Sequence, residues 1–509
     1  MPRLLRSTAL LALLSASPAL ADITVDDAWD IWKAQFTAYG LTLQASEARE
    51  GDALQIGEIT LSASFPENSG SAQISFPGPR FAATGDGRVR ITFPETSTAS
   101  LRGEITGEGS LALAAEVRGT GEGGLMSGNP GDVVTEWKSD GLDVELLDLA
   151  VSGEKAVDLT GAIHLSGIVQ RMATKITATH VEIEGETGYA NYEMTYAFTV
   201  PDKAAGDMRM QGGGTGEGIS VTQNAALPRE GIDPLGLDKQ LREGMRLASH
   251  VTTARTTSLA KSWLGETLLT DQVTEASDYV VSATIAASGL DYGGSTGAFS
   301  ARVEAPEIPV PISLSGAGVE ARLLMPLLKG EAAQDAALRL AIRDFTLADD
   351  LWSLFDPAAA LPRDPMTLDM DLTAMAKIAF EFLDFRALLG GAEPVGLPVM
   401  VETATLNGFT LKAVGGEITG TGAFTFDYDD WETYPGMPAP EGETHFVIRG
   451  ANALIGKLVE MGVMKEEEAM PARMGLMMFA KPGEGEDVLV SDIEVKKTGE
   501  ITANGMRVK

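Results

Sequence analysis

The residues with the clearest potential for chemistry are a serine set between glycines, Gly293-Gly-Ser-Thr-Gly297. Their spacing matches the nucleophile elbow of serine hydrolases, in which a strand precedes the serine and a helix follows it to hold the hydroxyl on a strained turn. Here a strand-like segment, 298–303, follows instead. Because the helix is missing, the pattern favours a hairpin turn over a nucleophile.

A second glycine motif, Gly119-Thr-Gly-Glu-Gly-Gly124, has the spacing of a dinucleotide-binding fingerprint. That fingerprint requires a helix opening directly after it, and no helical pattern follows here. The formal net charge of −33 also disfavours phosphate groups. We therefore predict no cofactor and no nucleic-acid partner.

Histidines and clustered acids are the remaining candidates for metal binding or catalysis. Neither the histidines nor the acids have the spacing of a zinc site or a calcium loop, so we predict no metal and assign no catalytic residue. A hydrolase with an unrecognised site stays open as an alternative, because acid pairs can meet by chance among 72 carboxylates. The residues considered are His164, His180, His250, His445, Asp369, Asp371, Asp427, Asp429 and Asp430.

The first 21 residues have the pattern of an export signal. Arg3 and Arg6 precede an apolar segment, 10–14, and Ala19-Leu-Ala21 resembles a small-residue cleavage site. We expect cleavage between Ala21 and Asp22 and a periplasmic protein, with secretion as the alternative. No later segment offers the roughly 18 uninterrupted apolar residues of a membrane-spanning helix.

Composition indicates a mainly β protein without disulfides. The chain has no cysteine, so its stability depends on burial of apolar groups. Glycine supplies 57 of 509 residues and aromatic residues only 6%, as expected for many strands joined by tight turns. The acidic surface also disfavours adhesion to anionic lipid headgroups.

The order of patterns predicts extended antiparallel sheets in two halves, with a few amphipathic helices packed on them, a mainly β or α+β fold. A capped helix is predicted at 24–39, and period-two alternation follows over 41–200. Glycines and prolines in 201–236 favour a boundary there. We therefore divide the mature chain into regions 22–235 and 236–509.

The last hundred residues carry the most distinct pattern. Two strands are predicted around Gly415–Gly416, which would place Phe409 opposite Gly422. A pair of short helices is predicted at 451–480, and the second carries a methionine stripe. Methionine adapts its shape to apolar partners, so these residues could line an apolar pocket, although filling of a core is the commoner role of such a stripe. The candidate ligand-binding residues are Phe409, Met470, Met474, Met477 and Met478.

Several segments of the chain resemble the family called domain of unknown function 2125, which consists of exported Gram-negative proteins. The resemblance covers most of the mature chain and is strongest after Ala276. It implies an exported envelope protein and brings no catalytic residues. The segments are Gly289-Leu-Asp-Tyr-Gly-Gly294, Phe355-Asp-Pro357, Leu361-Pro-Arg-Asp-Pro365, Gly450-Ala-Asn-Ala-Leu-Ile-Gly-Lys-Leu-Val-Glu-Met-Gly462, Ala472-Arg-Met-Gly-Leu-Met-Met-Phe-Ala-Lys-Pro-Gly-Glu-Gly-Glu-Asp487 and Ala503-Asn-Gly-Met-Arg507.

Three functions remain at this point. The first is a non-catalytic binder or carrier of an apolar envelope molecule such as a lipid. The second is a structural or assembly protein of the envelope that acts through protein contacts. The third is the hydrolase described above, and we rank it last because folds alone do not specify chemistry.

Overall fold

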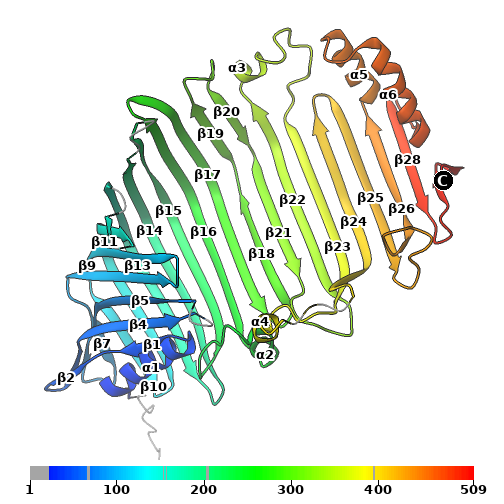
Figure 1. The fold of residues 1–509 in the computed structure, drawn as a ribbon. Helices are drawn as coiled ribbons and strands as arrows, with labels where there is room; N and C mark the ends of the chain where they lie inside the picture. Colours follow the sequence, from blue (N-terminus) through cyan, green and yellow to red (C-terminus); the bar gives the residue numbers. More distant parts are fainter. Residues whose placement is uncertain are drawn as a thin grey trace, which may run out of the picture.

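The computed structural model describes residues 22–65, 69–152, 154–155, 158–201, 206–391, 393 and 396–509. The expected export signal and its last residue, Ala21, lie outside the described residues. The described strands pair antiparallel in a single sheet of thirty strands, so the mainly β prediction is confirmed (Figure 1).

The strands follow one another with short connections. The first group is β1 (Thr42–Gln44), β2 (Glu47–Glu50), β3 (Ala53–Ile56), β4 (Glu58–Ser64), β5 (Gly70–Pro77), β6 (Arg80–Ala83), β7 (Val89–Thr92), β8 (Thr96–Ile105), β9 (Gly109–Thr120) and β10 (Gly123–Asn129). The long strands are β11 (Asp132–Val151), β13 (Asp158–Ile176), β14 (His180–Val200), β15 (Met208–Pro228), β16 (Arg246–Leu264) and β17 (Thr267–Ala286), with the short β12 (Glu154–Lys155) beside β11.

The sheet then continues to the carboxyl end. Its strands there are β18 (Gly289–Thr296), β19 (Phe299–Glu304), β20 (Ile312–Gly316), β21 (Gly318–Met325), β22 (Gln334–Leu347), β23 (Met366–Ile378), β24 (Val399–Ala413), β25 (Gly416–Asp427), β26 (Ala439–Arg449), β27 (Lys481–Pro482), β28 (Val488–Val495), β29 (Ile501–Ala503) and β30 (Met506–Arg507). Strand β15 pairs with both β14 and β16 across the segment where we expected a boundary. The division into two regions stays a prediction.

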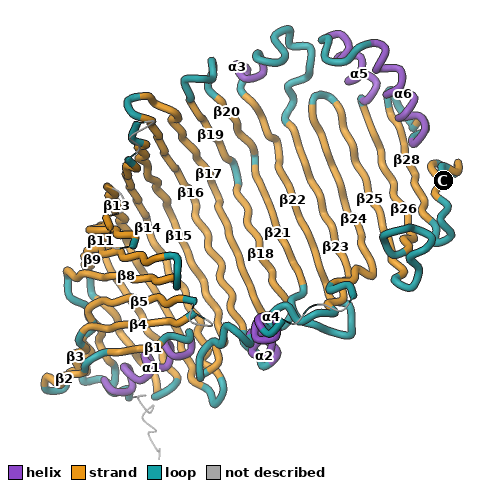
Figure 2. The backbone as a smooth tube through the Cα atoms, viewed as in Figure 1, coloured by secondary structure: helices purple, strands orange, loops and turns teal. Residues whose placement is uncertain are grey.

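Helices occupy the margins of this sheet, as Figure 2 shows. They are α1 (Val25–Ala38), α2 (Leu237–Arg242), α3 (Asp349–Trp352), α4 (Phe385–Leu389), α5 (Ala451–Glu460) and α6 (Glu466–Phe479). The predicted first helix and the predicted pair at 451–480 are confirmed. Helix α1 begins with a capping box, in which the Thr24 hydroxyl accepts from Asp27 N and the Asp27 carboxylate accepts from Thr24 N.

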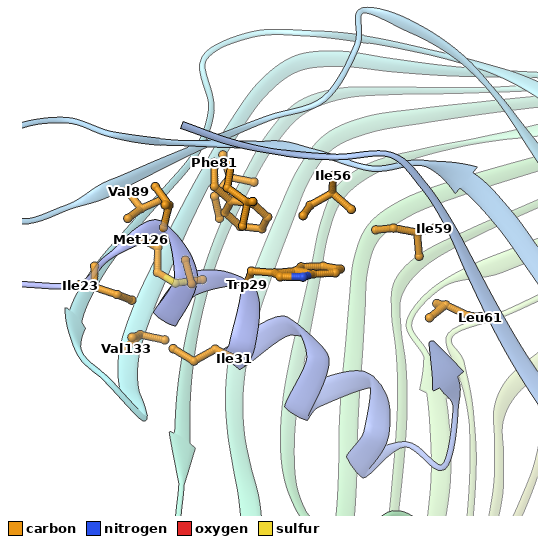
Figure 3. Close-up of a cluster of buried hydrophobic side chains, with 14 residues drawn as sticks. Ile23, Trp29, Ile31, Ile56, Ile59, Leu61, Phe81, Val89, Met126 and Val133 are labelled. Atoms are coloured by element: carbon orange, nitrogen blue, oxygen red, sulfur yellow. The ribbon is translucent and has the colours of Figure 1, made fainter. Parts of the chain in front are cut away.

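The only extensive core in the described residues surrounds α1. The first strands curl round this helix, so that Trp29 lies between Phe81 on one side and Met126 and Val133 on the other (Figure 3). Trp29 is 1% exposed, and its indole Nε1 donates to Glu47 Oε1 at 2.6 Å. Trp29 therefore packs helix α1 against the strands around it.

The two faces of the sheet can be followed from strand to strand, because Cα partners in an antiparallel pair point to the same side. Val181 and Ile183 pack on Ala38 of α1, which defines the inner face. From Ile183 the partners on this face run across the sheet through Ala225, Leu247, Ile285, Leu290 and Met325. Beyond them, Leu323, Leu338, Leu372, Leu406, Gly422, Thr444 and Ile493 continue it.

A row of unpaired residues crosses the long strands at one level; we call it the crease, formed by Gly167, Ala190, Gly218, Ala254 and Asp278. Gly167, Gly218 and Asp278 have φ of 60°, 61° and 49°. Each strand carries one extra residue opposite an extra residue of its neighbour, so pairing resumes in register on both sides.

The crease changes which residues reach the inner face. In β17, Val281 and Ile285 follow the crease residue Asp278 and lie on the inner face. Before Asp278, it is Ala276 that lies on this face. The Cα partner of Ala276 is Phe299 of β19, whose partner in turn is Gly316 of β20. Strand β20 in turn pairs with β22, where Phe345 is the partner of Met366. The inner-facing residues thus change from odd to even numbers, and the apolar side chains stay on one face.

Two local predictions were wrong. Strands β18 and β19 both pair with the same side of β17, so Gly297 interrupts one long strand instead of turning a hairpin. Phe409 lies opposite Gly420, because the turn between β24 and β25 is formed by Val414 and Gly415, with φ of 48° and 81°.

Candidate ligand-binding face

The inner face carries no charge over most of its width. Apart from crease residues and the bulge residues Asp344 and Glu402, no Asp, Glu, Lys or Arg of the described parts of β14–β26 points to this side. This is notable in a chain with 72 acids and 39 basic residues. The large side chains on it include Met194, Tyr196, Phe198, Tyr279, Tyr292, Leu323, Met325, Leu340, Ile342, Met370, Phe409, Leu411 and Phe446.

The outer face holds the charges instead. Arg322 Nη2 donates to Asp291 Oδ2 at 2.8 Å, and Arg339 Nη2 donates to Asp369 Oδ2 at 2.7 Å. These hydrogen bonds hold the pKa of Asp291 and of Asp369 below the usual value. The sheet therefore has one face that carries the ion pairs and one face that is largely uncharged.

Two cavities lie on the inner face, on neighbouring parts of β17. The first, of about 420 Å³, is lined by Tyr39 and by inner-face residues of five strands, including Ile183, Ala225, Leu247, Ala283 and Leu290. The second, of about 330 Å³, is lined by residues that include Tyr279, Val281, Tyr292, Ala321, Leu323 and Leu340. We call them the helix cavity and the central cavity. They share no lining residue.

Helices raise the margins of the inner face. Leu241 of α2 is fully buried in a cluster with Leu247 and Ile285, both on this face. At the other end Leu454 of α5 lies over Gly416, and Ser491 Oγ donates to the carbonyl of Phe479 at the end of α6. Helices therefore border the inner face at its ends and along one margin. We call this bordered inner face the floor.

The five candidate residues from the sequence separate into two places. Phe409 lies on the inner face, with its ring 6.4 Å from that of Phe446. Met470, Met474, Met477 and Met478 lie on α6 and are exposed by 68%, 66%, 48% and 57%, so they do not fill a core. Their role in binding stays a prediction.

Residues that the sequence analysis did not single out make up most of the inner face, Tyr279 and Tyr292 among them. The sequence does contain their signal, an alternation of apolar residues that changes parity at a small residue or an aspartate. In β14, for example, Val181, Ile183 and Tyr189 give way to Tyr192 and Met194 on either side of Ala190. Pattern searches with a fixed period of two miss such a change.

His445, a residue suited to acid–base chemistry, lies on the outer face beside a carboxylate and a lysine. His445 Nδ1 is 2.6 Å from Asp492 Oδ1, and Lys481 Nζ is 2.9 Å from Asp492 Oδ2. The hydrogen bonds from Lys481 and His445 lower the pKa of Asp492. In the described residues no serine or threonine hydroxyl bonds to His445, and no group of three acids or histidines gathers to hold a metal ion.

The carboxy-terminal part of the chain is similar to a known protein family. Residues 270–507 match the model of a family described as "Uncharacterized protein conserved in bacteria (DUF2125)". We call residues 270–507 the DUF2125 region. Neither a curated protein nor a solved structure matches the chain significantly. Among the described helices, none is long and apolar enough to cross a membrane.

The DUF2125 region extends the sheet with smaller groups of buried side chains than the amino-terminal part has. In the described residues the largest fully buried side chains all lie between Trp29 and Leu241, ahead of this region. Within it, inner-face side chains remain open to solvent, such as Tyr292 at 53% and Leu323 at 39%. The DUF2125 region is thus a single layer with an uncovered apolar floor.

Proposed function

We propose that this protein is an exported, periplasmic, non-catalytic binder of acyl chains, which lie on the inner face of the sheet. The observation that carries the proposal is the absence of charge from this face in a strongly acidic chain, together with its exposure to solvent. Burial of apolar surface is favourable by roughly 25 cal/mol of free energy for each Å² removed from water, so binding of a ligand that covers the floor is favoured.

The extent of the floor supports a binding role. From β14 to β26 the sheet is on the order of 50 Å wide, at ~4.8 Å between neighbouring strands. Exposed apolar side chains recur across this width, among them Met194, Tyr292, Leu323 and Leu411. Large apolar patches usually mark interaction sites.

The shape of the floor favours flexible chains over a protein partner. The margins are raised by α1, α2, α5 and α6, so a second copy or another flat sheet meets the helices before it reaches the floor. The two cavities have volumes near the lower end of the range usual for small-molecule pockets. An acyl chain is thin enough to lie in them.

The test is binding of a polyene fatty acid, whose fluorescence rises in apolar surroundings, to the mature protein and two leucine variants. Leu323 lies on the floor and Leu259 on the outer face, and both are exposed, by 39% and 50%. We expect Leu323→Asp to weaken binding at least tenfold, since it places a carboxylate where the chain lies. Leu259→Asp should bind as the unchanged protein does, and equal effects of both substitutions would contradict the proposal.

A second candidate is an assembly protein that acts through protein contacts, and the exposed methionines of α6 favour it. Mass spectrometry of the intact protein isolated from its own cells separates the two functions. A bound lipid supports the acyl-chain binder, whereas a stoichiometric polypeptide that is lost in Met474→Glu supports assembly.

A further inference from the structure

We infer that the floor binds at least two acyl chains at once, one in the helix cavity and one in the central cavity. This inference rests on the proposed function and adds to it how many sites there are and where they lie. The two cavities have separate linings, although both lie on β17. Ala283 and Ile285 belong to the helix cavity, and Tyr279 and Val281 to the central cavity.

A tyrosine marks the border between the cavities. Tyr292 of β18 is the Cα partner of Ala283, yet Ala283 lines the helix cavity while the Tyr292 side chain lines the central cavity. Its side chain is 53% exposed, so it stands up from the floor. An acyl chain that lies along the strands on one side of the Tyr292 ring leaves the cavity on the other side unoccupied.

The ends of the two cavities also differ. The helix cavity reaches Tyr39 directly after α1, where the curled part of the sheet closes the floor. The central cavity lies over β17, β18, β21 and β22, and the floor continues beyond it toward Met370 and Phe409. An acyl chain in the helix cavity therefore meets a closed end, whereas an acyl chain in the central cavity has open floor beside it.

The occupant is an acyl chain because the side chains that face the two cavities carry no charge. The inner-face polar side chains are Gln223 and Ser249 in the helix cavity and Tyr279, Tyr292 and Thr296 in the central cavity. Arg322 also borders the central cavity, but its side chain points to the outer face, where it donates to Asp291. A ligand with a buried ionic group would find no ionic partner in either cavity, which disfavours its binding. A charged headgroup must therefore stay at the margin or in solvent.

The experiment counts bound hexadecanoic acid on the intact mature protein by native mass spectrometry. Two alanines at equivalent places on the floor allow each cavity to be filled separately, Ala283→Phe for the helix cavity and Ala321→Phe for the central one. Ala423→Phe on the outer face, where Ala423 is exposed, is the control. We expect at least two chains on the unchanged protein and the control, one fewer on each single variant, and two fewer on the double variant.

The results separate the two proposals. Binding of a single chain, or loss of both chains in either single variant, overturns the two-cavity inference while leaving an acyl-chain binder intact. Absence of any bound chain overturns the proposed function itself. Circular dichroism checks that the variants fold, and Ala283→Leu and Ala321→Leu replace any phenylalanine variant that does not.

Discussion

The ring of Phe446 lies over the bare backbone of Gly420, and the ring of Phe409 meets it edge to face, with centroids 6.4 Å apart at 75°. A Cβ added at Gly420 would come within 2.1 Å of the Phe446 ring. The glycine thus makes room for an aromatic ring on the floor, a known way of supporting glycine in a strand.

We expect Gly420→Val to lower the free energy of unfolding by about 1–3 kcal/mol, the usual cost of overpacking, because Phe446 must leave its place. Gly408, in the neighbouring strand, has nothing within 4 Å of an added Cβ and gives the matched control. Urea unfolding of Gly420→Val and Gly408→Val measures the difference. If both variants unfold at the same urea concentration, the aromatic contact contributes nothing.

The crease requires residues without bulk. Gly167 has φ of 60°, and an added Cβ would lie 2.7 Å from the Cβ of Ala190 in the next strand. Gly265 has φ of 59° but nothing within 4 Å. Gly167→Ala should therefore lower the free energy of unfolding by about 1–3 kcal/mol more than Gly265→Ala does. Both substitutions place a side chain on a left-handed backbone, but only the one at Gly167 also causes overpacking. Thermal unfolding of the two variants tests this, and equal melting temperatures would show that the crease tolerates side chains.

Stability is concentrated at the amino-terminal end. Trp29→Ala removes a fully buried ring from the cluster around α1 and should cost about 3–5 kcal/mol. Tyr292→Ala removes a ring of similar size from the open floor and should cost less than about 1 kcal/mol. Denaturant unfolding compares them. A large loss for Tyr292→Ala would mean that the floor is packed in solution.

Asp487 caps α5 from the loop before β28. Its Oδ2 accepts from Ala453 N at 2.9 Å, and its Oδ1 accepts from the Asn452 side chain at 2.8 Å. Burial would raise the pKa of Asp487, but the hydrogen bonds from Ala453 and Asn452 outweigh it and hold the pKa below its usual value.

We expect Asp487→Ala to lose about 0.5–2 kcal/mol at pH 7, the usual range for a lost cap. Because the pKa is lower in the folded state, the ionised carboxylate stabilises the fold above its unfolded pKa near ~3.9, and this contribution disappears as the pH falls through the folded value. The two proteins should therefore converge in stability once the pH lies below the folded-state pKa of Asp487. Asp487→Asn keeps one acceptor oxygen and should be intermediate at pH 7, and a constant difference at all pH values would rule out the ionised cap.

The sequence by itself determined the local elements. The cap at Thr24 and the paired helices after Gly450 follow from side-chain chemistry within a few residues, and both are present. It also determined that strands dominate. These features depend on hydrogen bonds and alternation along the chain itself.

Only the tertiary structure decided that the strands form one sheet with one uncharged face. That outcome depends on register between strands far apart in sequence, and on a crease whose extra residues must align across neighbours before the change of parity makes sense. Gly297 reads locally as a turn, and only pairing with β17 shows that it interrupts a long strand. The floor, the two cavities and the exposed methionines of α6 arise from which surfaces remain uncovered after folding, a property that no single segment specifies.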